Sequence, residues 1–316
     1  MMSRFSFAGS LAVASVCLVA EAETYSDPIP LSGGEVLPIN VASGTDTYTG
    51  AITGEGSIKK TGGGTLELAN SGNTFDGGIE VTAGTLKATK SGAFGSGDVG
   101  CSASTSISFA APDGVFDNNF GRPGTVSKTS YARFTWYFVE NTTLNGNLDL
   151  PAPAAHQLVT TKQGTGAADS SLMVWNGTVT CPNSMYWEYL YGTYEFHGPL
   201  LVKVFRPGTA DASGVCGRVR LYSDENVIMQ YEDRGDVTQR WTFEQTEENV
   251  LGGAKLTVQG GGSGCQGGYN LNGKDQTVSA LGIYDAFSSR ITKAFTGAAV
   301  KSENDPATLT ITGRGE

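Results

Sequence analysis

Metal-ligating and phosphate-binding motifs are scarce in this sequence of 316 residues. It contains two histidines, His156 and His197, far apart in the sequence, and we expect each to be a surface or strand residue. The cysteines are widely spaced and include no C-x-x-C pair, which argues against a zinc site. Glycine-rich segments such as Gly260–Gly268 are not followed by a helical pattern, which argues against a dinucleotide or phosphate loop. We therefore expect no metal and no cofactor.

Positive charge is also limited. The 21 lysines and arginines are outnumbered by 31 acidic residues, which gives a formal net charge of −10. Such a surface repels phosphate backbones and anionic lipid headgroups. Nucleic acid and peripheral membrane binding are therefore not expected.

The sequence has one long apolar run, Phe7–Ala20, and it is shorter than the roughly 20 residues that a membrane-spanning helix requires. Arg4 precedes the run, and Ala20-Glu21-Ala22 follows it with small residues at the spacing that signal peptidase recognises. These features favour a secretory signal peptide over residues 1–22 rather than a transmembrane anchor. We expect cleavage after Ala22.

Cysteine is too rare for a disulfide scaffold. Cys17 belongs to the signal peptide, and the remaining cysteines are Cys101, Cys181, Cys216 and Cys265. An even number in an exported protein permits two disulfides with three possible pairings. Buried free thiols are an equally good interpretation, so both alternatives stay open.

Glycine is abundant, with 44 residues, which suits many tight turns between short strands. The segment Gly56–Leu68 recurs, with one glycine fewer, as Gly77–Ala88. Ile58 reappears as Ile79 and Leu66 as Leu86, so the period is about 20 residues, which is typical of a solenoid. Within the repeat we expect Leu66 and Leu68 to point inward and Glu67 outward.

The same residues resemble a known family. Lys60-Thr-Gly-Gly-Gly-Thr-Leu, then Asn73-Thr-Phe-Asp-Gly-Gly, then Ala83-Gly-Thr-Leu are similar to the autotransporter-associated β-strand repeat, also called the passenger-associated transport repeat. The resemblance implies a right-handed parallel β-helix in a secreted or surface-displayed passenger region. It also implies a Gram-negative-type bacterium, with the protein at the cell surface and associated with the outer membrane.

We expect an all-β chain, a right-handed parallel β-helix (β-solenoid) with irregular middle rungs, because no segment has a convincing helical pattern. After the signal peptide we expect four parts: a leader or N-terminal cap over 23–50, β-strand repeats over 51–98, irregular rungs over 99–253 and regular rungs over 254–316. The alternative for about 125–250 is an antiparallel β-sandwich, because aromatic-rich all-β segments look alike in sequence.

Two groups of residues are candidates for a site. Tyr186, Trp187, Tyr189 and Tyr191 are tentative glycan-binding aromatics, because flat rings on a β surface stack on sugar faces. The competing interpretation is that alternate rings, in this region and in Phe134–Phe138, fill the interior of wide coils. Asp233 and Asp236 are the first acidic residues to inspect for a carbohydrate-active enzyme, which needs two carboxylates across a cleft.

The function expected from these patterns is structural. We predict an exported, non-enzymatic β-solenoid that acts as a stalk or adhesin, with glycans or host and matrix surface molecules as partners. A carbohydrate-active β-helix enzyme or glycan-binding module is the alternative. We also expect a C-terminal domain, anchor or partner to follow Glu316, because a good strand pattern ends just before it. The oligomeric state stays open.

Overall fold

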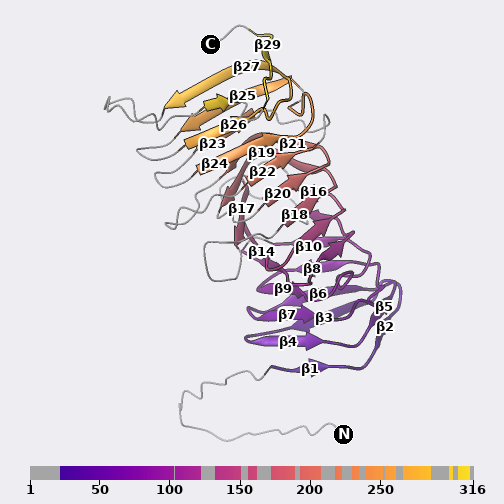
Figure 1. Ribbon diagram of the computed structural model, residues 1–316. Coiled ribbons are helices and arrows are strands. Elements are labelled where there is room, and N and C mark those ends of the chain that lie inside the picture. Colours follow the sequence, from indigo (N-terminus) through magenta and orange to yellow (C-terminus); the bar gives the residue numbers. More distant parts are fainter. Residues whose placement is uncertain are drawn as a thin grey trace, which may run out of the picture.

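A computed structural model describes residues 22–102, 104–121, 132–150, 156–161, 172–188, 193–207, 218–222, 230–234, 240–251, 253–260, 266–285, 299–301 and 305–313. Within these residues every regular element is a β-strand. Every strand pairing among them is parallel. The strands stack into a rod with β1 at one end and β29 at the other (Figure 1).

The rod is therefore a parallel β-helix, as the sequence predicted. Its right-handed winding is expected on general grounds, because connections between parallel strands of one sheet are almost always right-handed. No helix in the described part of the chain has the length and apolar character to cross a membrane. The expected signal peptide lies outside the described residues, apart from Ala22, and stays a prediction.

In the first half of the rod each coil passes through three rows, and every described pass through rows 1 and 2 forms a strand. Row 1 contains β1 (Thr24–Tyr25), β4 (Thr45–Tyr48), β7 (Thr65–Leu68), β9 (Thr85–Ala88), β11 (Ser106–Phe109), β14 (Ala132–Phe138) and β17 (His156–Thr161). Row 2 contains β3 (Val36–Asn40), β6 (Ser57–Thr61), β8 (Ile79–Val81), β10 (Val99–Cys101), β13 (Phe120–Gly121) and β16 (Leu148–Asp149).

Row 3 begins with β2 (Ile29–Leu31) and β5 (Ile52–Gly54), and main-chain hydrogen bonds continue it through Thr74 to Ile52 and Ser96 to Phe75. Its later strands form one sheet: β12 (Gly114–Phe116), β15 (Thr142–Leu144), β18 (Leu172–Trp175), β20 (Thr193–Phe196), β22 (Arg218–Leu221), β24 (Arg240–Gln245), β26 (Gln266–Asn270) and β28 (Ala299–Lys301).

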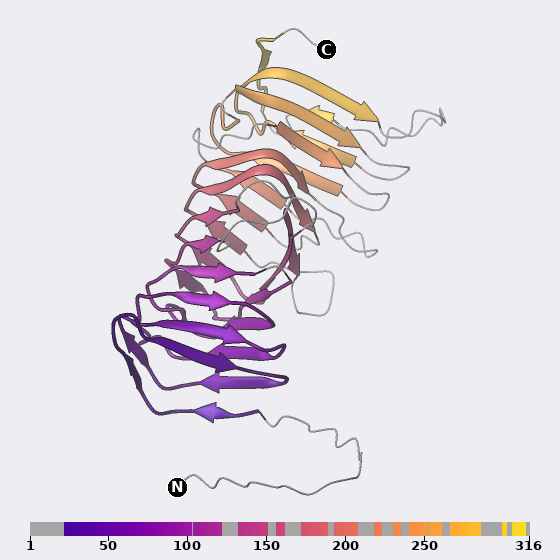
Figure 2. The same cartoon turned by 180° about the vertical axis from the view of Figure 1, so that it is seen from behind.

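Rows 1 and 2 merge at β19 (Val179–Glu188). Its first residues pair with β16 and its last with β17, and the register shifts between Cys181 and Ser184. The long strands that follow are β21 (Leu200–Pro207), β23 (Gln230–Arg234), β25 (Gly253–Gly260) and β27 (Gln276–Asp285), with the short β29 (Leu309–Ile311) on β27. The stacking order is the same when the rod is seen from behind (Figure 2).

The core consists of ladders in which one buried side chain lies above the next. Row 2 supplies a continuous ladder, each member at most 3% exposed: Ile58, Ile79, Val99, Phe120, Leu148, Val179 and Leu200. Burial of each such side chain contributes about 1.5–3 kcal/mol. Each coil buries its apolar side chains against those of its neighbours, so the coils share one continuous core and are stable together as a stack.

The repeat around residues 56–88 agrees with the sequence prediction in register and orientation. Ile58 pairs with Ile79 and Leu66 with Leu86. Leu66 and Leu68 are fully buried, and Glu67 between them is partly exposed. A Cβ at Gly62, where φ is 77°, would lie 2.2 Å from the Val41 oxygen, so this turn requires glycine.

The middle of the chain keeps the same topology. In the described residues of 125–250 all strand pairs are parallel, so the antiparallel sandwich is wrong for this part. Parallel stacking persists because the aromatic side chains alternate inward. Trp136 stacks on Trp175 with ring centroids 5.4 Å apart, and Trp175 stacks on Phe196 at 6.4 Å.

Residues 22–50 form strands β1 to β4. The outermost strands of rows 3 and 2 contain proline, Pro30 in β2 and Pro38 in β3. Proline cannot donate a main-chain hydrogen bond, so both edges are poor templates for further pairing.

Cys101 is a free, buried thiol, the second of the two alternatives left open for the cysteines. Cys181 lies in β19, whereas Cys216 and Cys265 lie outside the described residues.

Candidate binding surface

The corner between rows 3 and 2 has a constant length in four successive coils. A buried residue ends each row 3 strand, and a second buried residue opens the row 2 strand four positions later. The pairs are Phe116 and Phe120, Leu144 and Leu148, Trp175 and Val179, and Phe196 and Leu200. Two anchored residues per corner fix the three residues between them, so their side chains stack in columns from coil to coil.

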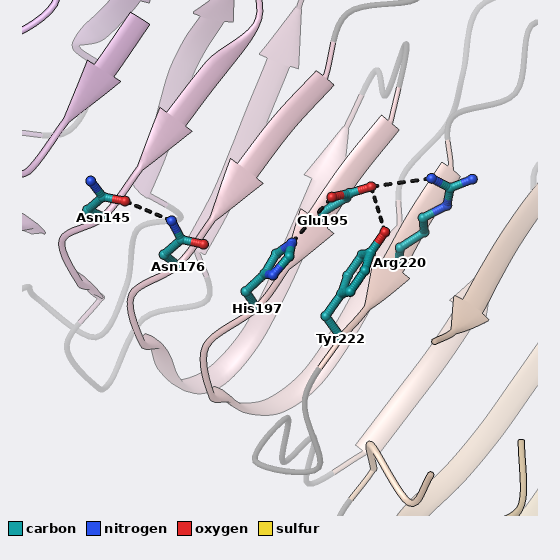
Figure 3. A network of polar contacts seen from close by, with 6 residues as sticks. All are labelled: Asn145, Asn176, Glu195, His197, Arg220 and Tyr222. Carbon is teal, nitrogen blue, oxygen red and sulfur yellow. Dashed lines mark hydrogen bonds and ion pairs between the residues drawn. The ribbon is translucent and has the colours of Figure 1, made fainter. Parts of the chain in front are cut away.

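One column on this corner is a ladder of amide and carboxylate groups. The Asn145 amide nitrogen donates to Asp117 Oδ1 at 2.6 Å. The Asn176 amide nitrogen donates to Asn145 Oδ1 at 2.7 Å, and Figure 3 shows this second bond. Each asparagine side chain therefore donates a hydrogen bond to the side chain at the same corner position of the preceding coil. The ladder is exposed, so it both pins the register of the coils and presents polar groups to solvent.

The middle residue of the corner is glycine in three of the four coils, Gly146, Gly177 and Gly198, whereas the first has the buried Asn118, which donates to the Gly97 oxygen at 2.7 Å. A Cβ at Gly177 would lie 2.1 Å from the Gly146 oxygen of the preceding coil. Such a contact is impossible without moving the backbone. Glycine at this place lets the corners approach closely enough for the amide ladder to form.

Rings replace amides in the next two coils of the same column. The imidazole of His197 stacks on the phenol ring of Tyr222, with centroids 4.2 Å apart and planes within 8° (Figure 3). This is offset or parallel stacking of the kind that aromatic pairs favour. The surface column thus changes from amide groups to flat rings along the rod.

Glu195 gathers three donors beside this ring pair. Its carboxylate accepts a hydrogen bond from the Tyr222 hydroxyl at 2.9 Å and lies 3.3 Å from both Arg220 and His197 (Figure 3). Its side chain is 12% exposed, against 37% for His197 and 30% for Arg220. The carboxylate is therefore set back, and the imidazole and guanidinium groups form the outer surface.

The cluster also changes the pKa of the Tyr222 phenol. Burial, followed by the hydrogen bond to Glu195, raises the pKa of Tyr222 above its ordinary value. Tyr222 is therefore a neutral donor at physiological pH. Among the described residues, Glu195 is the carboxylate that contacts all three of these side chains. The arrangement is suited to hold a rigid polar surface.

The predicted site residues are placed less completely. Tyr186 and Trp187 lie in β19, where they pair with Gln157 and Leu158 of β17. Their side chains, and all of Tyr189 and Tyr191, lie outside what the structure describes, so the glycan-binding aromatics stay a prediction.

The two candidate acidic residues are also only partly placed. Asp233 pairs with Val258 in the strand ladder, and Asp236 lies outside the described residues. Among the described residues no group of three or more His, Cys, Asp or Glu side chains is arranged to hold a metal ion.

Sequence reasoning missed the corner ladder and the Glu195 cluster. The available signal was a recurring pattern in which a buried residue is followed by Asn or His and then Gly: Leu144-Asn-Gly, Trp175-Asn-Gly and Phe196-His-Gly. It repeats the layout of Phe75-Asp-Gly in the recognised repeat. The pattern is hard to see because the coil spacing at this corner grows from 21 residues to 28 and 31.

Comparison with known proteins places this architecture in a class. Residues 58–88 match the family model of the passenger-associated-transport-repeat, so the resemblance identified in the sequence is confirmed. The chain is thus a parallel β-helix with an autotransporter passenger repeat.

A curated relative agrees with this class. A 70-residue segment, 22% of the chain, is 44% identical to the adhesin BmaC autotransporter of Brucella suis biovar 1 (strain 1330), of which it spans 2%. No solved structure matches the chain significantly.

Proposed function

We propose that this protein is an exported, surface-displayed passenger of a Gram-negative-type bacterium and that it acts as a stalk and adhesin. The observation that carries the proposal is the passenger repeat at 58–88, continued by parallel coils along the described chain. The similarity to an autotransporter named as an adhesin supports it over a limited segment.

The physical mechanism is projection. A β-helix is stiff along its axis because each coil shares its core with two neighbours. Such a rod holds outward side chains, for example the ladder at Asn145 and Asn176, at a fixed distance from the membrane. Binding groups on a rigid scaffold lose little conformational entropy when they bind, so a projecting rod is an efficient adhesin.

The test is adherence of particles that carry the full chain. Beads coated with the purified protein should adhere to epithelial monolayers or to immobilised matrix proteins more than beads coated with albumin. Soluble protein in excess should compete with the beads. Background adherence on every surface would contradict the adhesin role. Amino-terminal sequencing of the exported protein, with Glu23 expected first, tests the export step separately.

A further inference from the structure

The outer surface of row 2 contains a hollow of about 290 Å³. Its lining consists of Asp98, Val99, Gly100, Asn119, Phe120, Gly121 and Asp149. These residues come from three successive coils, β10, β13 and β16, and from the corner column beside them. The hollow is separate from the Glu195 cluster, which lies on row 3.

Two stacked glycines create the hollow. In this column of outward positions the residues follow one another from coil to coil in the order Glu80, Gly100, Gly121 and Asp149. Neither glycine has a positive φ, so the backbone does not require glycine here. Glycine inside a strand weakens it and often marks a site that a ligand or another chain approaches closely.

The rim of the hollow carries hydrogen-bond acceptors held in place. The Asn119 amide nitrogen donates to Asp98 Oδ1 at 3.0 Å, and Asn119 Oδ1 accepts the Asn147 main-chain N–H at 2.9 Å. The Asp98 carboxylate is thus oriented by a side chain that is itself fixed. Asp149 is exposed on the opposite side, so two carboxylates flank a floor of bare strand backbone.

This chemistry selects the ligand. A pyranose ring has a flat C–H face, which can lie on the glycine floor, and a rim of hydroxyl donors, which can bond to carboxylate oxygens. The volume, about 290 Å³, lies just below the range of drug-sized sites, which starts at about 300 Å³, so it suits one sugar ring. Among the described residues that line the hollow none is cationic, and the two carboxylates repel uronic, sialic or sulfated sugars.

We propose that the hollow over Gly100 and Gly121 binds a neutral pyranose residue of a surface glycan. The proposal gives the adhesin role a ligand class and rests on that role. Many copies of a weak site on a bacterial surface bind a multivalent glycan with high avidity.

The experiment is a printed array of neutral gluco-, galacto- and manno-configured oligosaccharides together with sulfated ones, probed with the full chain. Wild-type protein should bind a subset of neutral glycans and no sulfated glycan. Gly100→Val, which fills the hollow with a good strand former, should abolish binding. Asp149→Asn, an exposed and nearly isosteric change, should weaken binding at least tenfold. Thr180→Val, one coil beyond Asp149 in the same column, is the control and should bind normally.

Circular dichroism and thermal melting establish that each variant is folded. Neutral glycan binding that survives both Gly100→Val and Asp149→Asn would overturn the proposal, and so would preference for sulfated glycans. Calcium chloride titration that gives heat in wild type but not in Asp149→Asn would identify an ion site and would also overturn it. Bead adherence without any array signal would refute the hollow but leave the adhesin role intact, whereas loss of both would refute the two together.

Discussion

The ammonium group of Lys60 donates a 3.0 Å hydrogen bond to the main-chain oxygen of Ala83, in the next coil. It also donates to the oxygens of Thr61 and Gly62 in its own turn, at 2.9 and 2.6 Å. The side chain is fully buried, and burial lowers its pKa from the ordinary value. All three lysine donors are used, so Lys60 ties two successive turns of the repeat together.

Lys60→Met should reduce the free energy of unfolding by about 1–3 kcal/mol, because three partly buried carbonyl groups lose their donor. Urea unfolding followed by circular dichroism measures the change. Lys59→Met is a matched control, because Lys59 points outward and its ion pair with Glu80 is exposed. Equal losses in the free energy of unfolding of the two variants would refute the role of Lys60 in tying the two turns together.

The ion pair between adjacent strands of row 1 should help to fix the register between their coils. Lys87 and Glu67 form an ion pair at 2.8 Å across row 1. Glu67→Lys places two positive charges opposite each other and should cost about 0.5–1 kcal/mol. The double exchange Glu67→Lys with Lys87→Glu should restore most of the loss in a thermal melt at low salt. Failure of the exchange to restore stability would show that the pair contributes packing alone.

The ladder at Asp117 predicts a specific pH effect. Asn145→Asp replaces the donor of a 2.6 Å hydrogen bond with a second carboxylate and should cost about 1–2 kcal/mol at pH 7. The deficit should shrink as the pH falls through the carboxyl range near 4, because one group then takes up a proton. Asn176→Asp faces an amide and not a carboxylate, so its deficit should be smaller. Identical pH profiles for the two variants would argue against the ladder.

Alkaline pH should destabilise the fold through Cys101. Burial raises the pKa of this thiol from 9.0 to about 12. The folded chain therefore keeps a proton that the unfolded chain releases, so stability falls as the pH rises between 9 and about 12. Cys101→Ala should make the decline in melting temperature shallower over this interval. Parallel pH profiles above pH 9 would contradict the assignment.

The sequence predicted the repeat well because both of its periodicities survive there. The alternation of Leu66 and Leu68 reports the strand, and the return of Ile58 as Ile79 reports the coil. The pairing register follows directly from the two together. The inward alternation of the aromatics at Trp136 and Phe138 was also visible as a competing interpretation, and both rings are buried.

The surface features were not predictable in the same way. The hollow depends on Gly100 and Gly121 lying side by side, which requires the register of a coil whose sequence no longer resembles its neighbour. The contact between Glu195 and Tyr222 joins residues 27 positions apart and needs the same knowledge. Such contacts join residues of neighbouring coils and depend on how the coils stack. The alternation pattern of one strand does not tell which residue of the next coil lies beside it.

The constant corner between rows 3 and 2 has a consequence for how such a rod changes over time. In the four coils from Phe116 to Leu200 this corner restores the phase of the chain, since its two buried anchors are four positions apart in each. The added residues of these coils lie before or after the row 1 strand, between Gly121 and Ala132 and between Thr161 and Leu172, and the corner between rows 3 and 2 keeps its length. A lineage can therefore lengthen the connections around row 1, coil by coil, while this corner preserves the register of the four coils.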